Sequence, residues 1–413
     1  MMAPSLPFAE WVLIGLCCIA TCYVAVASLV RPAVRETVGG TREALRLSRT
    51  AAISVLKPLC GAEPRLVQNL ETFCVQTHPS YQLLFGVASA SDPAVAVVAR
   101  LRSAYPHLDI QLVVDGSHHG SNRKVGNLIN LAAHARHNLL VIADSDIAVE
   151  PDYLTRVTAP LFEREVGIVT CLYRARRVGG FWARIGALFI DEWFVPSVHI
   201  AHAAGSRSFG FGATLALTRD TLAASGGFHA LRDCLADDYR LAERVRDLGL
   251  AVVLSDVVVA TDVTERDFAS LWRRETRWLR TIRSVNPIGF AFLFVTFTSP
   301  WLVASGLLGV GIDASGGNIE HSYVDTIVDL STSLGLSARL LLHWRSARSW
   351  RGFWRDLPLL PLRDALLWLQ WFAAAFGSSV SWRGARVPVD SARTASKPHL
   401  RPDPDASDLP DSR

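Results

Sequence analysis

The chain has 413 residues, of which 50% are hydrophobic and 19% charged, and its mean hydropathy is +0.24. Soluble domains are usually more polar, so this composition predicts membrane segments beside one large domain. The formal net charge of +4 is too small to indicate a nucleic-acid partner. The seven cysteines show no zinc-site or redox-motif spacing, and we expect them to be reduced and buried, as suits a cytoplasmic domain.

The first predicted element is an N-terminal transmembrane helix over residues 8–30, an apolar run interrupted only by Glu10 near its start. No Lys or Arg precedes this run, which favours an anchor over a cleaved signal peptide. Arginines follow it closely, at Arg31, Arg35, Arg42, Arg46 and Arg49. The positive-inside rule therefore predicts that the N-terminus lies outside and that the next domain is cytoplasmic.

Residues 50–266 are predicted to form the catalytic domain, because strand-like and helix-like segments alternate along them. The strand candidates are residues 51–59, 82–89, 110–115, 138–144, 167–172 and 251–259, and helical patterns cover 64–76, 124–136 and 237–248. Several strand candidates are continuous apolar runs, typical of strands buried on both faces. The pattern predicts an α/β fold with a mainly parallel sheet and a ligand beyond the carboxyl ends of its strands.

Aspartates stand at those predicted strand ends. Asp92 follows the second strand candidate, and Asp144 ends the run LLVIAD, with Asp146 two residues further on. Carboxylates at a sheet's ligand edge suit Mg²⁺ or Mn²⁺, which bind a few carboxylates together with substrate phosphates. Taken alone, the D-S-D tripeptide is more typical of a turn or a helix cap than of a metal site.

Two later segments hold further polar candidates. Asp237 and Asp238 open a predicted helix, where acids also compensate the helix dipole without any catalytic role. Lys124 lies where a helix starts after a small polar loop, which suits a diphosphate or is a solvated basic turn. His118 and His119 lie in the same loop and are expected to be exposed.

Residues 267–286 are predicted to form an amphipathic interfacial helix containing the run R-E-T-R-W at 274–278. C-terminal membrane segments are then predicted within residues 287–382, in the apolar stretches 288–312, 327–342 and 357–380. If all of them crossed, Arg383 and Arg386 would lie outside, so one segment is expected to be re-entrant or interfacial. Residues 390–413, rich in Pro, Asp and Ser, are expected to be a disordered tail.

The order of these features resembles the membrane-bound, inverting GT-A glycosyltransferases, whose signature is D, D, D, (Q/R)xxRW. The matching positions are Asp92, Asp144, Asp238 and Arg274–Trp278. The segments SVLKPLCGAEP, NLETF, SDPA, KVGNL, DSDI, GGF and DDY look like the ceramide glucosyltransferase group. HGSNRKVGNLIN and ADSDIAVEPDYL are most similar to the bacterial hopanoid-biosynthesis glycosyltransferases. The similarity covers roughly residues 50 to 290.

The resemblance implies a UDP-sugar donor and a divalent metal, Mg²⁺ or Mn²⁺, as cofactor. Asp144 and Asp146 would hold the metal at the departing diphosphate, with Asp92 and Lys124 at the nucleotide sugar. The eukaryotic ceramide enzymes resemble this chain at Asp144 but lack an acid where Asp146 stands. Asp144 is therefore the firmer of the two metal-ligand assignments.

The resemblance also assigns the other half of the reaction. Asp238 would be the general base, and Arg274, Arg277 and Trp278 would hold the diphosphate or the acceptor at the membrane interface. The implied reaction moves N-acetylglucosamine from UDP-GlcNAc onto the hopanoid bacteriohopanetetrol. We expect a multi-pass protein of the bacterial inner membrane with its catalytic domain in the cytoplasm.

Other functions compete with this one. A ceramide or other sphingolipid glucosyltransferase using UDP-glucose shares the same motifs. A processive polysaccharide synthase would carry a Gln-rich final motif and more apolar segments, so it is the weaker alternative. A non-catalytic membrane protein would not need the base and the D-S-D, and a transporter would need many more spans.

Overall fold

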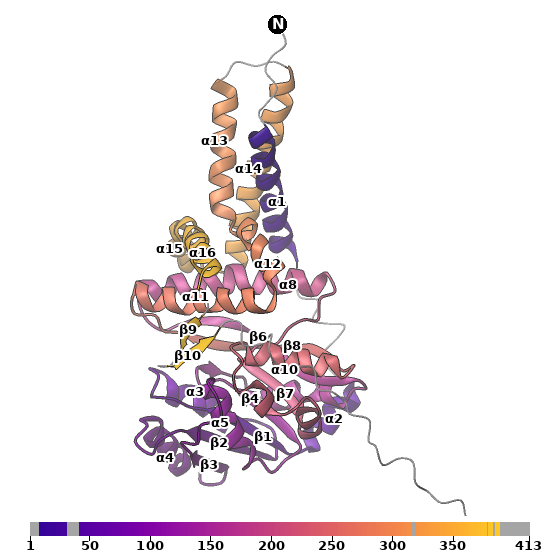
Figure 1. Cartoon of the computed structure of the whole chain (residues 1–413), viewed down its shortest axis with the longest axis vertical. Helices are drawn as coiled ribbons and strands as arrows, with labels where there is room; N and C mark the ends of the chain where they lie inside the picture. The colour runs from indigo at the N-terminus through magenta and orange to yellow at the C-terminus, as the bar shows by residue number, and fades with distance from the viewer. Residues whose placement is uncertain (1–7, 31–40, 315–318, 378, 383–384, 389–413) are drawn as a thin grey trace, which may run out of the picture.

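The computed structural model describes residues 8–30, 41–314, 319–377, 379–382 and 385–388. Figure 1 shows three tiers: an α/β domain, a transverse layer of helices across it, and a group of upright helices beyond that layer. Arg31, Arg35, Arg383 and the predicted tail at 390–413 lie outside the described residues.

The α/β domain is built on an eight-stranded sheet in the order β3-β2-β1-β4-β7-β6-β8-β5. The strands are β1 (Ile53–Pro58), β2 (Tyr81–Val87), β3 (Asp109–Val114), β4 (Leu139–Ala143), β5 (Ile147–Ala148), β6 (Val166–Arg177), β7 (Thr214–Thr218) and β8 (Ala251–Val263). Pairs β1–β2, β2–β3, β1–β4 and β6–β8 are parallel, whereas β7 is antiparallel to β4 and β6, and β5 is antiparallel to β8. The predicted α/β fold with a mainly parallel sheet is confirmed.

Helices cover both faces of this sheet, which explains the continuous apolar strands. Successive residues of β1 point to opposite sides: Val55 packs in one buried cluster with Phe73, and Leu56 in the other with Leu128. The surrounding helices are α2 (Arg42–Thr50), α3 (Leu66–Cys74), α4 (Ala94–Ala104), α5 (Arg123–Ala132), α6 (Tyr153–Thr158), η1 (Ala159–Phe162), α9 (Arg219–Ala224), η3 (Phe228–Leu231) and α10 (Asp237–Asp247).

The transverse layer consists of α7 (Phe181–Phe189), the π-helical turn η2 (Ile190–Phe194), α8 (Val195–Ala203) and α11 (Phe268–Val285). α11 begins with a capping box, because Asp267 accepts a bond from Ser270 N at 2.7 Å while the Ser270 hydroxyl caps Asp267 N. The helix that bears R-E-T-R-W therefore lies between the sheet and the upright helices (Figure 1).

The upright helices are α1 (Phe8–Leu29), α13 (Thr298–Ala314) and α14 (Ile319–Ser346), and each packs against the other two. Within the described residues, α1 alone is long and apolar enough to cross a membrane as a single helix. Pro287–Thr296 and Thr298–Val310 pass the same test only as a pair, and they are bent by 52° at their junction. The apolar stretch 288–312 is thus a broken segment: α12 (Pro287–Phe292), η4 (Leu293–Thr296) and then α13.

The last predicted apolar stretch, residues 357–380, forms a helix over only part of its length. After α15 (Trp350–Asp356) and η5 (Leu357–Leu359), α16 (Leu360–Ala375) has 16 residues and gives way to the hairpin β9 (Ser379–Trp382) and β10 (Ala385–Pro388). Sixteen residues span about 24 Å, less than the roughly 30 Å hydrocarbon core. α16 packs beside α11 in the lower part of the group rather than along the upright helices (Figure 1).

Candidate active site

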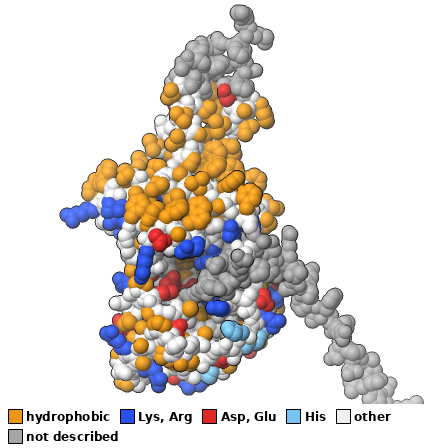
Figure 2. Space-filling view, turned by 60° about the vertical axis from the view of Figure 1, so that its left-hand side comes forward, with side chains coloured by type: hydrophobic (Ala, Val, Ile, Leu, Met, Phe, Trp, Pro, Cys, Tyr) orange, Lys and Arg blue, Asp and Glu red, His pale blue; other side chains and the backbone are white. Residues whose placement is uncertain are grey.

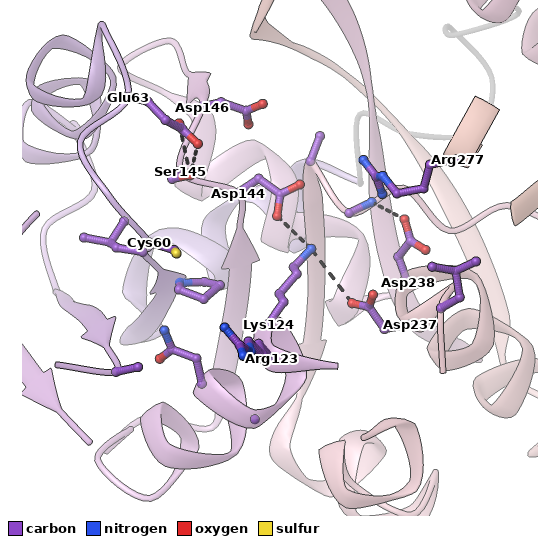
Figure 3. A pocket seen from close by; sticks show the side chains of 18 of the residues that line it. Cys60, Glu63, Arg123, Lys124, Asp144, Ser145, Asp146, Asp237, Asp238 and Arg277 are labelled. Carbon is purple, nitrogen blue, oxygen red and sulfur yellow. Dashed lines mark hydrogen bonds and ion pairs between the residues drawn. The ribbon is translucent and has the colours of Figure 1, made fainter. Parts of the chain in front are cut away.

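All the residues predicted for the site line one cleft of about 610 Å³ at the carboxyl ends of the parallel strands. They are Asp92, Lys124, Asp144, Asp146, Asp238, Arg274, Arg277 and Trp278. They arrive on separate elements, and Figure 3 shows Lys124 pointing between Asp144 and Asp237, with Asp238 and Arg277 close by. The cleft opens below the hydrophobic surface of the transverse layer (Figure 2).

Lys124 lies at the centre of the charges. Its Nζ is 2.7 Å from Asp144 Oδ1 and 3.9 Å from Asp237 Oδ2, and its side chain is 14% exposed. Asn122 caps α5 by accepting from Val125 N at 3.1 Å, which sets Lys124 in the first turn facing the cleft. Burial alone would lower the pKa of Lys124, but the surrounding aspartates raise it overall. The solvated-turn interpretation is therefore wrong.

The turn after β4 carries the D-S-D residues. The Asp144 carbonyl accepts from Lys57 Nζ at 2.7 Å, and this buried lysine also lies 3.6 Å from the centre of the Phe73 ring. Burial lowers the pKa of Lys57 to about 7. Asp146 accepts from Thr261 at 3.2 Å, and burial, then the Asp144 charge, raises its pKa to about 7.

The donor set of this turn fits a metal that is shared with phosphates. Among the described residues, no group of three or more His, Cys, Asp or Glu side chains is arranged to hold an ion by itself. Asp144 and Asp146 supply oxygen ligands, and the raised pKa of Asp146 reflects burial first and then the nearby charges of Asp144 and Glu63, which a cation would offset. Mg²⁺ and Mn²⁺ at phosphate-transfer sites typically use one or two carboxylates.

Asp92 has a different environment from the other acids. Both of its carboxylate oxygens lie 3.0 Å from Gly61 N, and Oδ1 also accepts from Ala94 N at 2.8 Å. The side chain thus joins the loop after β1 to the start of α4 at the edge of the cleft. Its neighbour in that loop, Cys60, is exposed, as is Cys22, so the expectation that all cysteines are buried is wrong.

Asp238 is held by backbone amides. Oδ2 accepts from Gly212 N at 2.7 Å and Oδ1 from Tyr239 N at 2.8 Å. A side chain at Gly212 would come within 3.0 Å of Lys124 Nζ and 3.2 Å of Asp238 Oδ2, so glycine permits this close approach. Burial, then the Asp237 charge, raises the pKa of Asp238 to about 6. The N-cap of α10 is Ala236, so Asp238 is not the capping residue, and it lies in the first turn of the helix.

The R-E-T-R-W run places two arginines at the cleft from the transverse layer. Arg274 is ion-paired with Glu265, and its guanidinium carbon lies 5.1 Å from the centre of the Trp278 ring. Arg274 Nε is buried and has no hydrogen-bond partner among the described residues. Burial lowers the pKa of Arg277, and the Arg274 charge adds to this effect. Such desolvated cations favour an anionic ligand.

Sequence reasoning missed several cleft residues. Glu63 accepts from Ser145 Oγ, and Tyr173, Ile190 and Phe211 make the cleft aromatic and apolar near Asp238. The run F-G-F-G at 209–212 was an available signal, because glycines beside aromatics permit close backbone approach to a site.

One loop residue also differs from expectation. His119 is half-buried and bonds Asn130 Oδ1 at 2.6 Å, whereas His118 is exposed as expected.

A mainly parallel α/β sheet that gathers carboxylates, a lysine and buried arginines beneath apolar helices defines a GT-A-like transferase. The chain belongs to glycosyl transferase family 21, whose family model matches residues 12–395. It is therefore a glycosyltransferase by family.

The chain is 27% identical to Ceramide glucosyltransferase 1 of Caenorhabditis elegans over 267 residues, covering 64% of this chain and 56% of that protein. It is 26% identical to Ceramide glucosyltransferase 3 of the same organism, covering 56% and 51%. The chain thus spans about half the length of these curated relatives.

Among solved structures, the chain is similar to the mannosyltransferase PcManGT from Pyrobaculum calidifontis in complex with GDP-Man and Mn²⁺. The sequence identity is 17%, the TM-score is 0.46, and the match covers 88% of this chain and 97% of that one.

Proposed function

We propose that this protein transfers a hexose from a UDP-sugar to the hydroxyl of a membrane lipid, with inversion at the anomeric carbon. The supporting observation is the meeting of Asp238, the Asp144–Asp146 turn and the arginines of α11 in one cleft beneath an apolar layer. Inverting transfer requires a base on one side of the anomeric carbon and charge neutralisation at the leaving diphosphate on the other.

In the proposed reaction, Asp238 removes the proton from the acceptor hydroxyl. The acceptor oxygen attacks the anomeric carbon, a new glycosidic bond forms, and the bond to the diphosphate oxygen breaks so that UDP leaves. The two amides on Asp238 keep its carboxylate oriented, and its raised pKa makes it a stronger base than an exposed aspartate.

The leaving diphosphate is assigned to the cationic side of the cleft. Asp144 and Asp146 would hold a divalent metal, which supplies Lewis-acid stabilisation of the departing phosphate. Arg274 and Lys124 would contact the phosphates, and Arg274 has a buried Nε available for such a contact. Asp92 would help to bind the nucleotide by fixing the loop after β1, whose Gly61 amide donates to its carboxylate.

The acceptor is assigned to the aromatic side of the cleft. Tyr173, Phe211 and Trp278 line it near Asp238, and Tyr173 packs against both other rings, with centroids 6.3 and 6.4 Å away. This wall leads to Phe194, which is stacked on Tyr173 at 4.9 Å and precedes α8 beside α1. An apolar acceptor approaching from the membrane would meet these rings before it reaches the base.

We further propose that α1, α13 and α14 span the membrane and that α16 lies at its cytoplasmic face. The N-terminal end of α1, the C-terminal end of α13 and the N-terminal end of α14 all point away from the sheet (Figure 1). On α14, Arg339 is buried against Glu192, whereas Leu330 is 66% exposed, an arrangement that suits lipid outside and polar groups inside.

This proposed topology is consistent with the positive-inside rule at the C-terminal end of the chain, where crossing by every apolar segment would not be. With α16 interfacial, the arginines after α14 and those of the final hairpin are on the cytoplasmic side, together with the catalytic domain. α16 and the residue after it turn apolar side chains outward, since Leu369, Phe372 and Phe376 are 60%, 60% and 61% exposed. Figure 2 shows such hydrophobic side chains covering the level above the cleft. The bacterial inner membrane remains the proposed location.

The acceptor class has two candidates. The curated relatives named ceramide glucosyltransferase support ceramide with UDP-glucose. The resemblance of HGSNRKVGNLIN, which contains Lys124, to hopanoid-biosynthesis enzymes supports bacteriohopanetetrol with UDP-GlcNAc. Both acceptors present a hydroxyl on a large apolar body, and the aromatic wall suits either one.

The deciding experiment incubates the full-length protein in membranes with UDP-glucose or UDP-GlcNAc and a panel of ceramide and hopanoid acceptors. Lipid mass spectrometry should show a single hexose added to one acceptor class. Sugar chains of many lengths would instead indicate a processive synthase. The proposed function would be contradicted if the wild-type protein formed no product from any of these donors and acceptors.

A further inference from the structure

α16 carries its polar side chains on the inward face. Arg363, Asp364 and Gln370 are buried, whereas the exposed stripe of the same helix is Leu and Phe. Burying such side chains is costly unless each finds a partner, so this face is built around specific contacts. Its partners lie on α11 and on the upright helices.

The first contact joins α16 to the R-E-T-R-W run. Arg363 Nη1 lies 2.8 Å from Glu275 Oε2, and Gln370 Nε2 donates to the same carboxylate oxygen at 2.9 Å. Arg363 Nη2 also donates to Gln370 Oε1 at 2.8 Å, which closes the network. The side chains of Glu275 and Arg363 are 0% and 1% exposed. Water therefore competes little with these bonds, and their geometry is firmly set.

Glu275 is also next to the cleft arginines. It stands between Arg274 and Arg277 in the sequence, and its Oε1 lies 3.6 Å from Arg274 Nη2. Within one helical turn, α11 thus presents Arg274 and Arg277 to the cleft and Glu275 to α16. A movement of Glu275 would displace the neighbouring arginines with it.

The next residue on α16 is tied to the upright helices. Asp364 accepts from the Ser299 amide at 3.0 Å on α13, and it lies 3.4 Å from Arg339 Nη2 on α14. Arg339 also pairs with Glu192 of the π-helical turn at 2.7 Å. α16 therefore connects helices proposed to span the membrane with the helix that carries the cleft arginines.

We infer that Glu275 is a positioning residue and that α16, through Arg363 and Gln370, holds Arg274 and Arg277 in the geometry that binds the donor diphosphate. This inference rests on the proposed use of a UDP-sugar. The C-terminal interfacial helix is then a working part of the donor site, although it contributes none of the residues that line the cleft.

The test uses full-length protein in lipid nanodiscs and compares Glu275→Gln, Arg363→Met and Arg363→Lys with wild type. The Kd for UDP with Mg²⁺, the donor KM, kcat and the thermal unfolding temperature are measured for each. Glu275→Gln and Arg363→Met should raise the UDP Kd and donor KM about tenfold per folded molecule, because misplaced arginines lose phosphate contacts. The UDP Kd and donor KM of Arg363→Lys should fall between those of the other two variants and those of wild type. Lysine keeps the positive charge but lacks the paired N–H donors of the guanidinium.

Asp256→Asn is the matched control, since it breaks the Arg156–Asp256 pair at 2.8 Å, outside the cleft. It should leave the UDP Kd unchanged. If the single variants fail to fold, the double variant Glu275→Gln, Arg363→Met removes both buried charges while leaving an amide opposite Gln370, and it should fold with weak UDP binding.

A merely structural role predicts fewer folded molecules with an unchanged UDP Kd and donor KM, and that result would overturn the inference. Failure of the underlying function has a separate signature, because wild type itself would then bind no UDP and transfer no sugar.

Discussion

Lys124 Nζ lies 2.7 Å from Asp144 Oδ1, so one ammonium group touches the acid proposed for the metal. The same lysine lowers the pKa of Asp238, the proposed base, against the effects of burial and of Asp237. Lys124 therefore couples the donor side of the cleft to the acceptor side through charge.

Replacing Lys124 with Met should move the acid limb of the pH–rate profile to higher pH. The ammonium favours the ionised form of Asp238, so its loss raises the pKa of Asp238 above the present value of about 6. The measurement is kcat against pH at saturating donor. Arg246→Met, on the same helix as Asp238 but outside the cleft, is the control. An unshifted limb in Lys124→Met would contradict the coupling.

In the wild-type enzyme, kcat should fall as pH falls through about 6. A general base works only when ionised, and the pKa of Asp238 is raised to about 6 by burial and by Asp237. The test is to measure single-turnover rates in membranes from roughly pH 5 to pH 8, a range that brackets the pKa of Asp238. Full activity persisting well below that pKa would argue against Asp238 as the base.

Asp238→Asn should abolish transfer while leaving UDP-sugar binding largely intact. Asn keeps the shape of the side chain but cannot take a proton, and general-base catalysis contributes roughly 10²–10⁴-fold to rate. Calorimetric UDP binding and lipid product formation are measured on the same preparation. Glu243→Gln on α10, a residue outside the cleft, should retain both properties. Near-normal turnover in Asp238→Asn would end the base assignment.

Chelation by EDTA should stop activity, and Mg²⁺ or Mn²⁺ should restore it. The proposed ligands are Asp144 and Asp146, and Asp144→Asn should raise the metal concentration needed for half-maximal rate more than Asp146→Asn. The reason is that the eukaryotic ceramide enzymes resemble this chain at Asp144 but lack an acid at the position of Asp146. Full activity in a verified metal-free preparation would rule out the ion.

Reporter fusions test the proposed topology. A periplasmic reporter inserted between α13 and α14 should be active, and the same reporter between α14 and α15 should be inactive. The reason is that α13 and α14 are proposed to cross the membrane in opposite directions while α16 stays at the cytoplasmic face. An active reporter fused after β10 would show instead that α16 crosses.

The sequence predicted much of the α/β domain because its signals are local. The apolar run that became β4 reflects burial on both faces, and all six strand candidates overlap strands of the sheet. The strand β7 was missed because Thr214–Thr218 is a short run after a glycine-containing loop, and it pairs antiparallel with its neighbours rather than following the parallel pattern. The D, D, D, RxxRW order, through resemblance to a family, predicted a set of residues that the fold brings to one cleft.

What the sequence alone determined, then, was which residues stand at strand ends and helix starts, because backbone periodicity is written over a few neighbouring positions. Only the tertiary structure decided that Lys124 bridges Asp144 and Asp237, and that Glu275 is clamped by Arg363, 88 residues away. Such contacts depend on how whole elements pack, and a buried charge finds its partner only when the fold excludes water around both.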